Sequence, residues 1–254
     1  MKYALVDNIK SEASKGVRGI CPSCGSELIS KCGEKKANHW AHKVKDCDSW
    51  SEGETDWHRN WKNHFPIDWQ EITHTADDGK LHRADVRTDQ GWVLEFQHSY
   101  LKPEEKRSRD EFYSKLVWVV DGVRRKRDKN QFNDILEQSR DILHSVTVFN
   151  VHFPDDCRIL EEWRNSSSLV FFDFQEPELW FILPDMGKLG CFLAMVTRKE
   201  FVDLHKNKGF ENFFNEKIQE IREEVKRLNP NKRSYSIQRS LLPPRRIWRP
   251  KRHL

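Results

Sequence analysis

Apolar and polar positions alternate in a way that predicts a mixed sheet flanked by helices. Leu81–Thr88 and Trp92–His98 are strand-like and flank an Asp-Gln-Gly turn, which predicts an antiparallel hairpin. Leu116–Val120 is apolar without alternation and predicts a fully buried central strand. We therefore expect an α/β fold of the α+β type, built on a mixed sheet.

Further elements follow from the same pattern. The sequence predicts short strands at 3–6, 17–20 and 146–153, a hairpin over 169–183 with a third strand from Gly190 to Val196, and helices at 54–62, 102–115, 132–143 and 210–228. Proline and polarity interrupt the pattern after Asn229. We expect four units: a zinc-finger-like segment at 1–50, a core at 51–153, a hairpin with helices at 154–229, and a flexible arm at 230–254.

Ionisable residues gather in the first helix and hairpin. Glu54, His58 and Lys62 recur every four residues, so a helix would place them on one face. In the second hairpin strand, Glu95 and Gln97 share a face, and Asp85 can pair across to it. Two carboxylates held together resist joint ionisation unless a divalent cation lies between them, and oxygen ligands suit Mg²⁺ or Mn²⁺. The alternatives are a surface cross-strand pair and a solvated helix face.

Cysteine and histidine spacing predicts a second metal site. Cys21-x-x-Cys24 is followed by His39-x-x-His42, and these four residues could supply the ligands of a tetrahedral Cys₂His₂ zinc site. A rival set replaces one histidine with Cys32 or Cys47, and an unliganded reduced loop is the alternative without metal. A metal would supply much of the folding energy of a segment with so little apolar material.

Charge is distributed unevenly along the chain. The net charge is +4, yet the residues from Lys226 onward hold ten Lys or Arg and no acid, so residues 1–225 are net acidic. Arginines beside Trp248 suit contact with nucleic-acid phosphates and bases, and the alternatives for such a basic tail are RNA, acidic proteins or anionic lipid. No signal peptide and no apolar run of membrane-spanning length is evident, so we expect a cytoplasmic protein with no membrane contact.

Four motifs together resemble the CoiA-like competence protein family. They are Cys21-Pro-Ser-Cys24, His39-Trp-Ala-His42, His82-Arg-Ala-Asp-Val86 and Glu95-Phe-Gln-His-Ser99. More broadly, Glu54, Asp85 and Glu95-Phe96-Gln97 resemble the Glu, Asp, Glu-x-Lys pattern of restriction-endonuclease-like nucleases. The resemblance implies a zinc-finger-like segment before a nuclease-like core, in which Asp85, Glu95 and the Phe96 carbonyl hold the catalytic metal.

Gln97 stands where that superfamily usually has lysine. An amide can orient water but is not a base. Either Lys62 or His58 reaches in from the helix, or the metal alone lowers the pKa of the water, or the site is catalytically silent. In the family pattern glutamine is usual at this position.

Three functional hypotheses follow. The first is a metal-dependent deoxyribonuclease in competence, recombination, repair or defence, with DNA and possible recombination or defence proteins as partners. The second is a non-catalytic DNA-binding module that assists recombination of incoming strands. The third is a zinc-dependent scaffold that recruits a protein through its long C-terminal helix.

Overall fold

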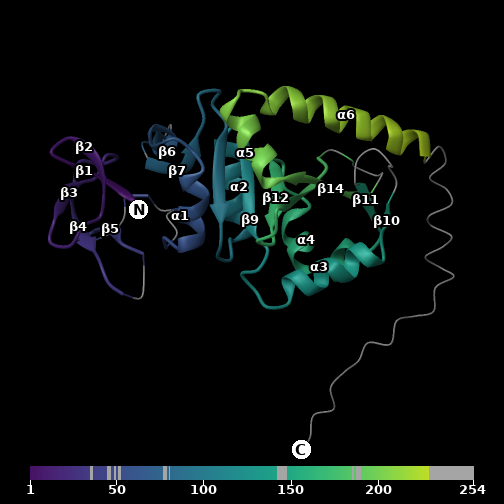
Figure 1. Ribbon diagram of the computed structural model, residues 1–254, viewed down its shortest axis with the longest axis horizontal. Helices are drawn as coiled ribbons and strands as arrows, with labels where there is room; N and C mark the ends of the chain where they lie inside the picture. The colour runs from purple at the N-terminus through teal and green to yellow at the C-terminus, as the bar shows by residue number, and fades with distance from the viewer. Residues whose placement is uncertain are drawn as a thin grey trace, which may run out of the picture.

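The chain forms two β-sheets and six α-helices within the residues that the structure describes. The computed structural model describes residues 1–228 except 35–36, 45–46, 49, 51–52, 77–78, 80, 142–147, 185 and 187–189. The predicted arm at 230–254 lies outside these residues. In Figure 1 the N-terminal sheet lies to the left of the larger sheet.

The N-terminal sheet is antiparallel, with strand order β2-β1-β3-β4-β5. Its strands are β1 (Tyr3–Val6), β2 (Ile9–Glu12), β3 (Arg18–Ile20), β4 (Glu27–Lys31) and β5 (His39–His42). Trp40 is buried at the centre of a small core. A Cβ on Gly19 would lie 2.7 Å from the Ala4 Cβ and 3.2 Å from the Trp40 ring, so only glycine allows this packing.

The larger sheet has nine strands in the order β10-β11-β14-β13-β12-β9-β8-β7-β6. They are β6 (Gln70–Thr75), β7 (Leu81–Arg87), β8 (Val93–Gln97), β9 (Leu116–Asp121), β10 (Arg140–Asp141), β11 (Val148–Val151), β12 (Leu169–Asp173), β13 (Glu178–Ile182) and β14 (Cys191–Thr197). β8, β9 and β12 run parallel, and the other pairs are antiparallel. Strands of the units predicted at 51–153 and 154–229 thus share one sheet.

Helices cover both faces of this sheet (Figure 1). One core contains Trp61 from α1 (Asp56–Asn63), Phe201 from α5 (Arg198–Lys206) and Phe214 from α6 (Phe210–Leu228). The opposite core contains Phe132 from α3 (Asp128–Glu137) and Trp163 from α4 (Arg158–Trp163), and Phe112 of α2 (Pro103–Phe112) packs against it. Two short 3₁₀ helices occupy Ile67–Trp69 and Pro154–Asp156. The layers confirm the predicted mixed α/β class.

Most predicted elements are confirmed, with differences at their ends. β9 is buried along its whole length, and Gly91 has φ +80° in the turn between β7 and β8. The first helix begins at Asp56, with Thr55 as its N-cap, so the prediction that Glu54 is helical was wrong. The Thr55 hydroxyl accepts the His58 N–H and so caps the N-terminal turn, and the helix begins at the residue after it. The helix predicted to Leu143 ends at Glu137, and 142–143 lie outside the described residues.

Candidate functional site

The predicted carboxylates meet where β7 and β8 separate. The two strands pair at Val86–Leu94 and Arg87–Val93, and the same register would set Asp85 opposite Glu95. Instead, the Asp85 Oδ2 accepts the Phe96 N–H at 3.0 Å. The Asp85 side chain thus accepts a backbone N–H that could otherwise form a hydrogen bond between the strands. Asp85 and Glu95 both line the cavity at this point.

Glu95 lies inside the protein with a carboxyl group that resists ionisation. It is 6% exposed and pairs in register with Trp118. Burial, and then the Asp85 charge, raise the pKa of Glu95 well above its ordinary value. Arg109 opposes this shift, with its Nη1 3.5 Å from the Glu95 Oε2. The pair is therefore short of positive charge.

Lys62 joins three carboxylates in the same site. Its Nζ lies 2.9 Å from the Glu54 Oε2, 2.9 Å from the Glu71 Oε1 and 3.7 Å from the Asp85 Oδ1. Burial would lower the pKa of Lys62, but Glu71, Asp85 and Glu54 together raise it above its ordinary value. The lysine is therefore held as a cation and serves to position its acidic partners.

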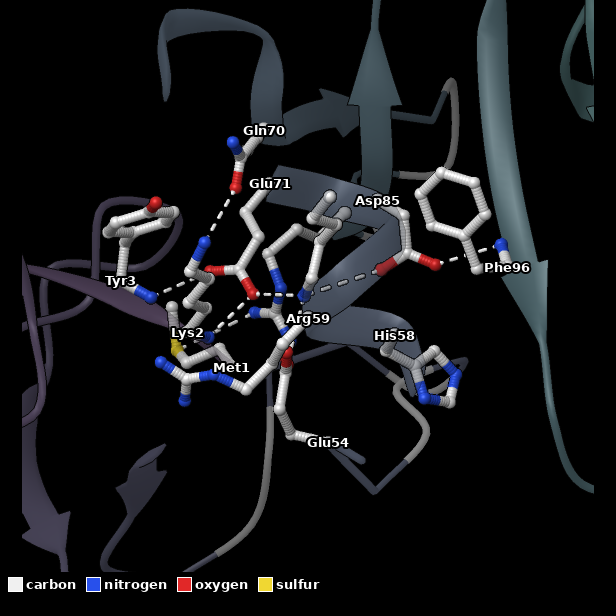
Figure 2. A network of polar contacts seen from close by, with 12 residues as sticks. Met1, Lys2, Tyr3, Glu54, His58, Arg59, Gln70, Glu71, Asp85 and Phe96 are labelled. Carbon is white, nitrogen blue, oxygen red and sulfur yellow. Dashed lines mark hydrogen bonds and ion pairs between the residues drawn. The ribbon is translucent and has the colours of Figure 1, made fainter. Parts of the chain in front are cut away.

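Glu71, which the sequence did not predict as a site residue, forms a buried ion pair with this lysine. The Glu71 carboxylate accepts the Lys2 N–H at 2.6 Å, the Tyr3 N–H at 2.9 Å and the Lys62 Nζ. Burial would raise its pKa, but Lys62 and the neighbouring positive charges lower it far below its ordinary value. In Figure 2, Glu71 lies between Tyr3 and Asp85 and so connects the N-terminal sheet with the carboxylate site.

His58 and Gln97, the remaining predicted site residues, also line the cavity. The His58 Nδ1 lies 2.7 Å from the hydroxyl of Thr55. Gln97 is buried, and its amide Nε2 donates to the Ser99 carbonyl at 3.1 Å. The structure therefore gathers all six predicted residues around one cavity, from α1, the residue before its cap, β7 and β8.

The cavity has a volume of about 40 Å³ and an excess of acidic side chains. Five acidic and three basic side chains line it, which leaves two negative charges unbalanced by side chains. The Glu54 Oε1 is buried without a hydrogen-bond partner. A divalent cation would fit this charge and this donor set. A larger cavity of about 410 Å³, bordered by Trp163 and Cys191, has no carboxylate among its described lining residues.

A second cluster of metal ligands lies at the N-terminal sheet. The ligand atoms of Cys21, Cys24, His42 and Cys47 all lie within 4.8 Å of one another. The Cys21 and Cys47 sulfurs are 3.8 Å apart, and the Cys24 Sγ is 3.4 Å from the His42 Nε2. A tetrahedral zinc ion, with zinc–sulfur bonds of about 2.3 Å, would separate two sulfurs by about 3.8 Å. The group can therefore hold a metal ion such as zinc.

Cys47 completes this cluster in the place predicted for His39. His39 and His42 are three residues apart on β5, and residues with odd separation on a strand point to opposite faces. The His39 Nδ1 instead lies 2.9 Å from the Ala37 carbonyl. The rival set that included Cys47 therefore agrees with the structure.

The chemistry of the cysteines also suits a metal. Burial would raise the pKa of Cys24, but hydrogen bonds from Ser26 and His42 lower it to about 6. Burial, together with Cys21 and Cys24, raises the pKa of Cys47 above its ordinary value. Thiolates this close cannot all ionise without a cation among them.

Comparison with known protein families gave a match at the N-terminal part of the chain. Residues 7–49 match the model of the competence protein CoiA, N-terminal domain. The chain therefore carries a segment similar to the N-terminal domain of the competence protein CoiA. No match was found among curated proteins or solved structures.

The match covers one of the two candidate sites. All four clustered ligands fall within residues 7–49, whereas Asp85 and Glu95 lie beyond them. The match therefore supports a CoiA-like N-terminal segment and an association with competence, whereas both candidate metal sites are supported by their geometry alone. Across the described part of the chain, every helix is too short or too polar to cross a bilayer.

Sequence reasoning missed three partners of the residues at the carboxylate site. Glu71 binds Lys62, Arg109 lies 3.5 Å from the Glu95 carboxylate, and the Asp48 Oδ2 accepts the Arg83 N–H at 3.0 Å. Each makes its contact with a residue distant in sequence. The one local signal was Asp48 directly after Cys47, a charged residue beside a predicted metal ligand.

Proposed function

We propose that this protein is a divalent-metal-dependent deoxyribonuclease with a restriction-endonuclease-like core, acting in competence, recombination, repair or defence. The observation that carries the proposal is the pair of acidic side chains, Asp85 and Glu95, which come from adjacent strands and line one cavity of negative charge. We also propose that zinc is the structural metal of the cysteine cluster.

The residues present fit a hard cation at the carboxylates. Asp85 and Glu95 would hold Mg²⁺ or Mn²⁺ together with the Phe96 carbonyl, and the unpartnered Glu54 Oε1 would join directly or through water. Oxygen-rich sets with surplus negative charge are typical of these ions. When bound, such an ion polarises a phosphodiester and lowers the pKa of water.

The side chains around this pair orient the reactants. Lys62, held as a cation by three carboxylates, fixes the positions of Glu54 and Asp85. Its raised pKa makes it a poor proton acceptor near neutral pH, so it acts through charge and position. Gln97 orients the attacking water through its amide, and His58 forms part of the cavity wall.

A non-catalytic DNA-binding module is the second candidate. The observation that favours it is Gln97, a neutral amide whose Nε2 already donates to the Ser99 carbonyl. A site without a base can still bind a cation and a phosphate. This candidate predicts salt-sensitive DNA binding that survives removal of Mg²⁺ and substitution of Asp85.

A cleavage assay with supercoiled and single-stranded DNA and Mn²⁺ separates the two candidates. We expect cleavage by the native protein, and a loss of at least about 100-fold in Asp85→Asn and Glu95→Gln, since each removes a metal ligand. Asp203→Asn changes a surface acid of α5 and should cleave normally. Undiminished cleavage by both site variants would remove these residues from the mechanism, and DNA binding without any cleavage would favour the binding module.

A further inference from the structure

The knuckle of the cysteine cluster touches the large sheet directly. Ser23 lies between Cys21 and Cys24, and its hydroxyl is 2.6 Å from the hydroxyl of Thr73 on β6. Thr73 follows two residues after Glu71. Cys24 and Cys21 therefore lie one and two residues, respectively, from a contact with β6, the strand that carries Glu71.

The other end of the cluster reaches β7. Asp48 follows Cys47 and is buried, and it accepts the Arg83 N–H at 3.0 Å and the Trp50 N–H at 2.9 Å. Arg83 lies two residues before Asp85 on the same strand. Asp48 thus ties a metal ligand to the backbone beside a site carboxylate.

Trp50 extends this connection to Glu95. Its ring stacks on His82 of β7 with centroids 3.4 Å apart. Its carbonyl accepts the Arg109 Nη2 at 2.7 Å, and the same guanidinium approaches the Glu95 carboxylate to 3.5 Å. Asp48 and Trp50 therefore contact β7, the strand that carries Asp85. Trp50 also contacts Arg109, which approaches Glu95 on β8.

Glu71 supplies the third connection (Figure 2). It holds Lys62 and accepts both backbone N–H groups at the start of β1. β1 pairs with β3 at Leu5–Ile20, immediately before Cys21. Glu71 has φ +51°, a conformation that costs a residue with a side chain on the order of 1 kcal/mol, so its contacts maintain a strained backbone.

We propose that the metal at Cys21, Cys24, His42 and Cys47 sets the geometry of the carboxylate site, with Asp48 and Glu71 as positioning residues. A metal folds such a segment by fixing its ligands. Without it, Ser23, Asp48 and β1 lose their fixed places, and Asp85 and Glu95 lose the support of their neighbours. The inference rests on the proposed function only in taking Asp85 and Glu95 as the cation ligands.

The test is a Mn²⁺ titration of the full chain followed by electron paramagnetic resonance. We expect zinc-depleted protein to bind Mn²⁺ about 10–100-fold more weakly than zinc-loaded protein, the usual effect of removing outer support from a metal site. Equal affinity in the two forms would overturn the coupling. Failure of the zinc-loaded protein to bind Mn²⁺ at all would overturn both the coupling and the proposed function.

Two variants test the connection without removing zinc. Glu71→Gln keeps the shape of the side chain but loses the charge that holds Lys62, and Asp48→Ala loses the acceptor of the Arg83 N–H. We expect both to retain one equivalent of zinc and to bind Mn²⁺ about tenfold more weakly. Native Mn²⁺ affinity in both zinc-loaded variants would refute their positioning role.

Glu12→Gln is the matched control. Glu12 is another residue of the N-terminal sheet that contacts α1, because it forms an ion pair with Arg59. Its carboxylate also lies 3.7 Å from the Lys2 Nζ. Among the described residues, Lys62 pairs with Glu54, Glu71 and Asp85 and not with Glu12, so we expect native Mn²⁺ affinity. A loss as large as that of Glu71→Gln would show that any contact between the sheets has this effect, and would refute a specific role for Glu71.

Discussion

Glu95 is a carboxyl group placed where ionisation is unfavourable. Its side chain is buried on β8, close to the charge of Asp85, and these two causes raise its pKa well above the ordinary value. A group whose pKa is raised on folding binds more protons in the folded state, so the free energy of unfolding falls as pH rises above the ordinary glutamate pKa. Ionisation of Glu95 therefore lowers the free energy of unfolding, and a bound cation would offset this electrostatic cost.

Neutralising Glu95 should therefore stabilise the protein when Mg²⁺ and Mn²⁺ are absent. We expect Glu95→Gln to unfold about 2–4 °C higher at neutral pH if about 1 kcal/mol is recovered, with the difference shrinking as pH falls toward 4.5. Thermal unfolding monitored by circular dichroism at several pH values measures the difference in unfolding temperature and its dependence on pH. Added Mn²⁺ should stabilise the native protein and leave the variant unchanged. A variant less stable than the native protein at neutral pH would contradict this account.

Single residues were predictable where a local period governed them. Glu95, Gln97 and Asp85 were placed by strand alternation, and the structure agrees because β8 is regular. His39 was misplaced because the same alternation on β5 was not applied to it. Glu71 could not be found, since its positive φ and its three partners exist only after the two sheets pack together.

At the scale of elements, α1 is positioned by one buried carboxylate of β12. The Asp173 Oδ2 accepts the Trp57 Nε1 at 2.9 Å and the Trp61 Nε1 at 2.8 Å. Its Oδ1 accepts the Arg198 Nη2 at 2.6 Å, and Asp173 is 1% exposed. The helix that carries His58 and Lys62 is thus fixed to the sheet through both of its tryptophans.

Replacing Asp173 should weaken the fold more than an ordinary surface change. We expect Asp173→Asn to lower the free energy of unfolding by about 2–4 kcal/mol, because a partly exposed guanidinium and two indoles lose the buried charged group that accepts their hydrogen bonds. Urea denaturation followed by tryptophan fluorescence measures the change. Asp203→Asn on α5, with a partly exposed side chain, should shift it by less than about 0.5 kcal/mol. Equal effects of the two variants would mean that Asp173 does not anchor α1.

Elements with strong periodicity were predictable, and their neighbours in the sheet were not. The β7–β8 hairpin, β9 and α6 follow from pattern alone. β6 was missed because Gln70–Thr75 is largely polar and is specified by its pairing with β7. The insertion of β12, β13 and β14 between β9 and β11 depends on contacts between distant segments, which no local pattern encodes.

For the whole molecule, charge divides the chain into an acidic body and a basic end. Residues 1–225 carry more acidic than basic side chains, whereas residues 229–254 hold eight Lys or Arg and no acid. An acidic body repels the DNA backbone, so attraction to a polyanion has to come from the basic end. The carboxylate site would then depend on this end for access to its substrate.

Ending the chain at Leu228 should accordingly weaken DNA binding without weakening the fold. α6 already completes its packing through Phe214, Ile221 and Val225, so the unfolding temperature should change by less than about 1 °C. Contact with about six phosphates would make native binding fall by roughly 10³ between low and moderate salt, and the shortened chain should lose most of this slope. Fluorescence anisotropy with a labelled oligonucleotide at several salt concentrations measures it. A salt slope equal to that of the full chain would place the DNA contacts on the folded body, despite its net acidic charge.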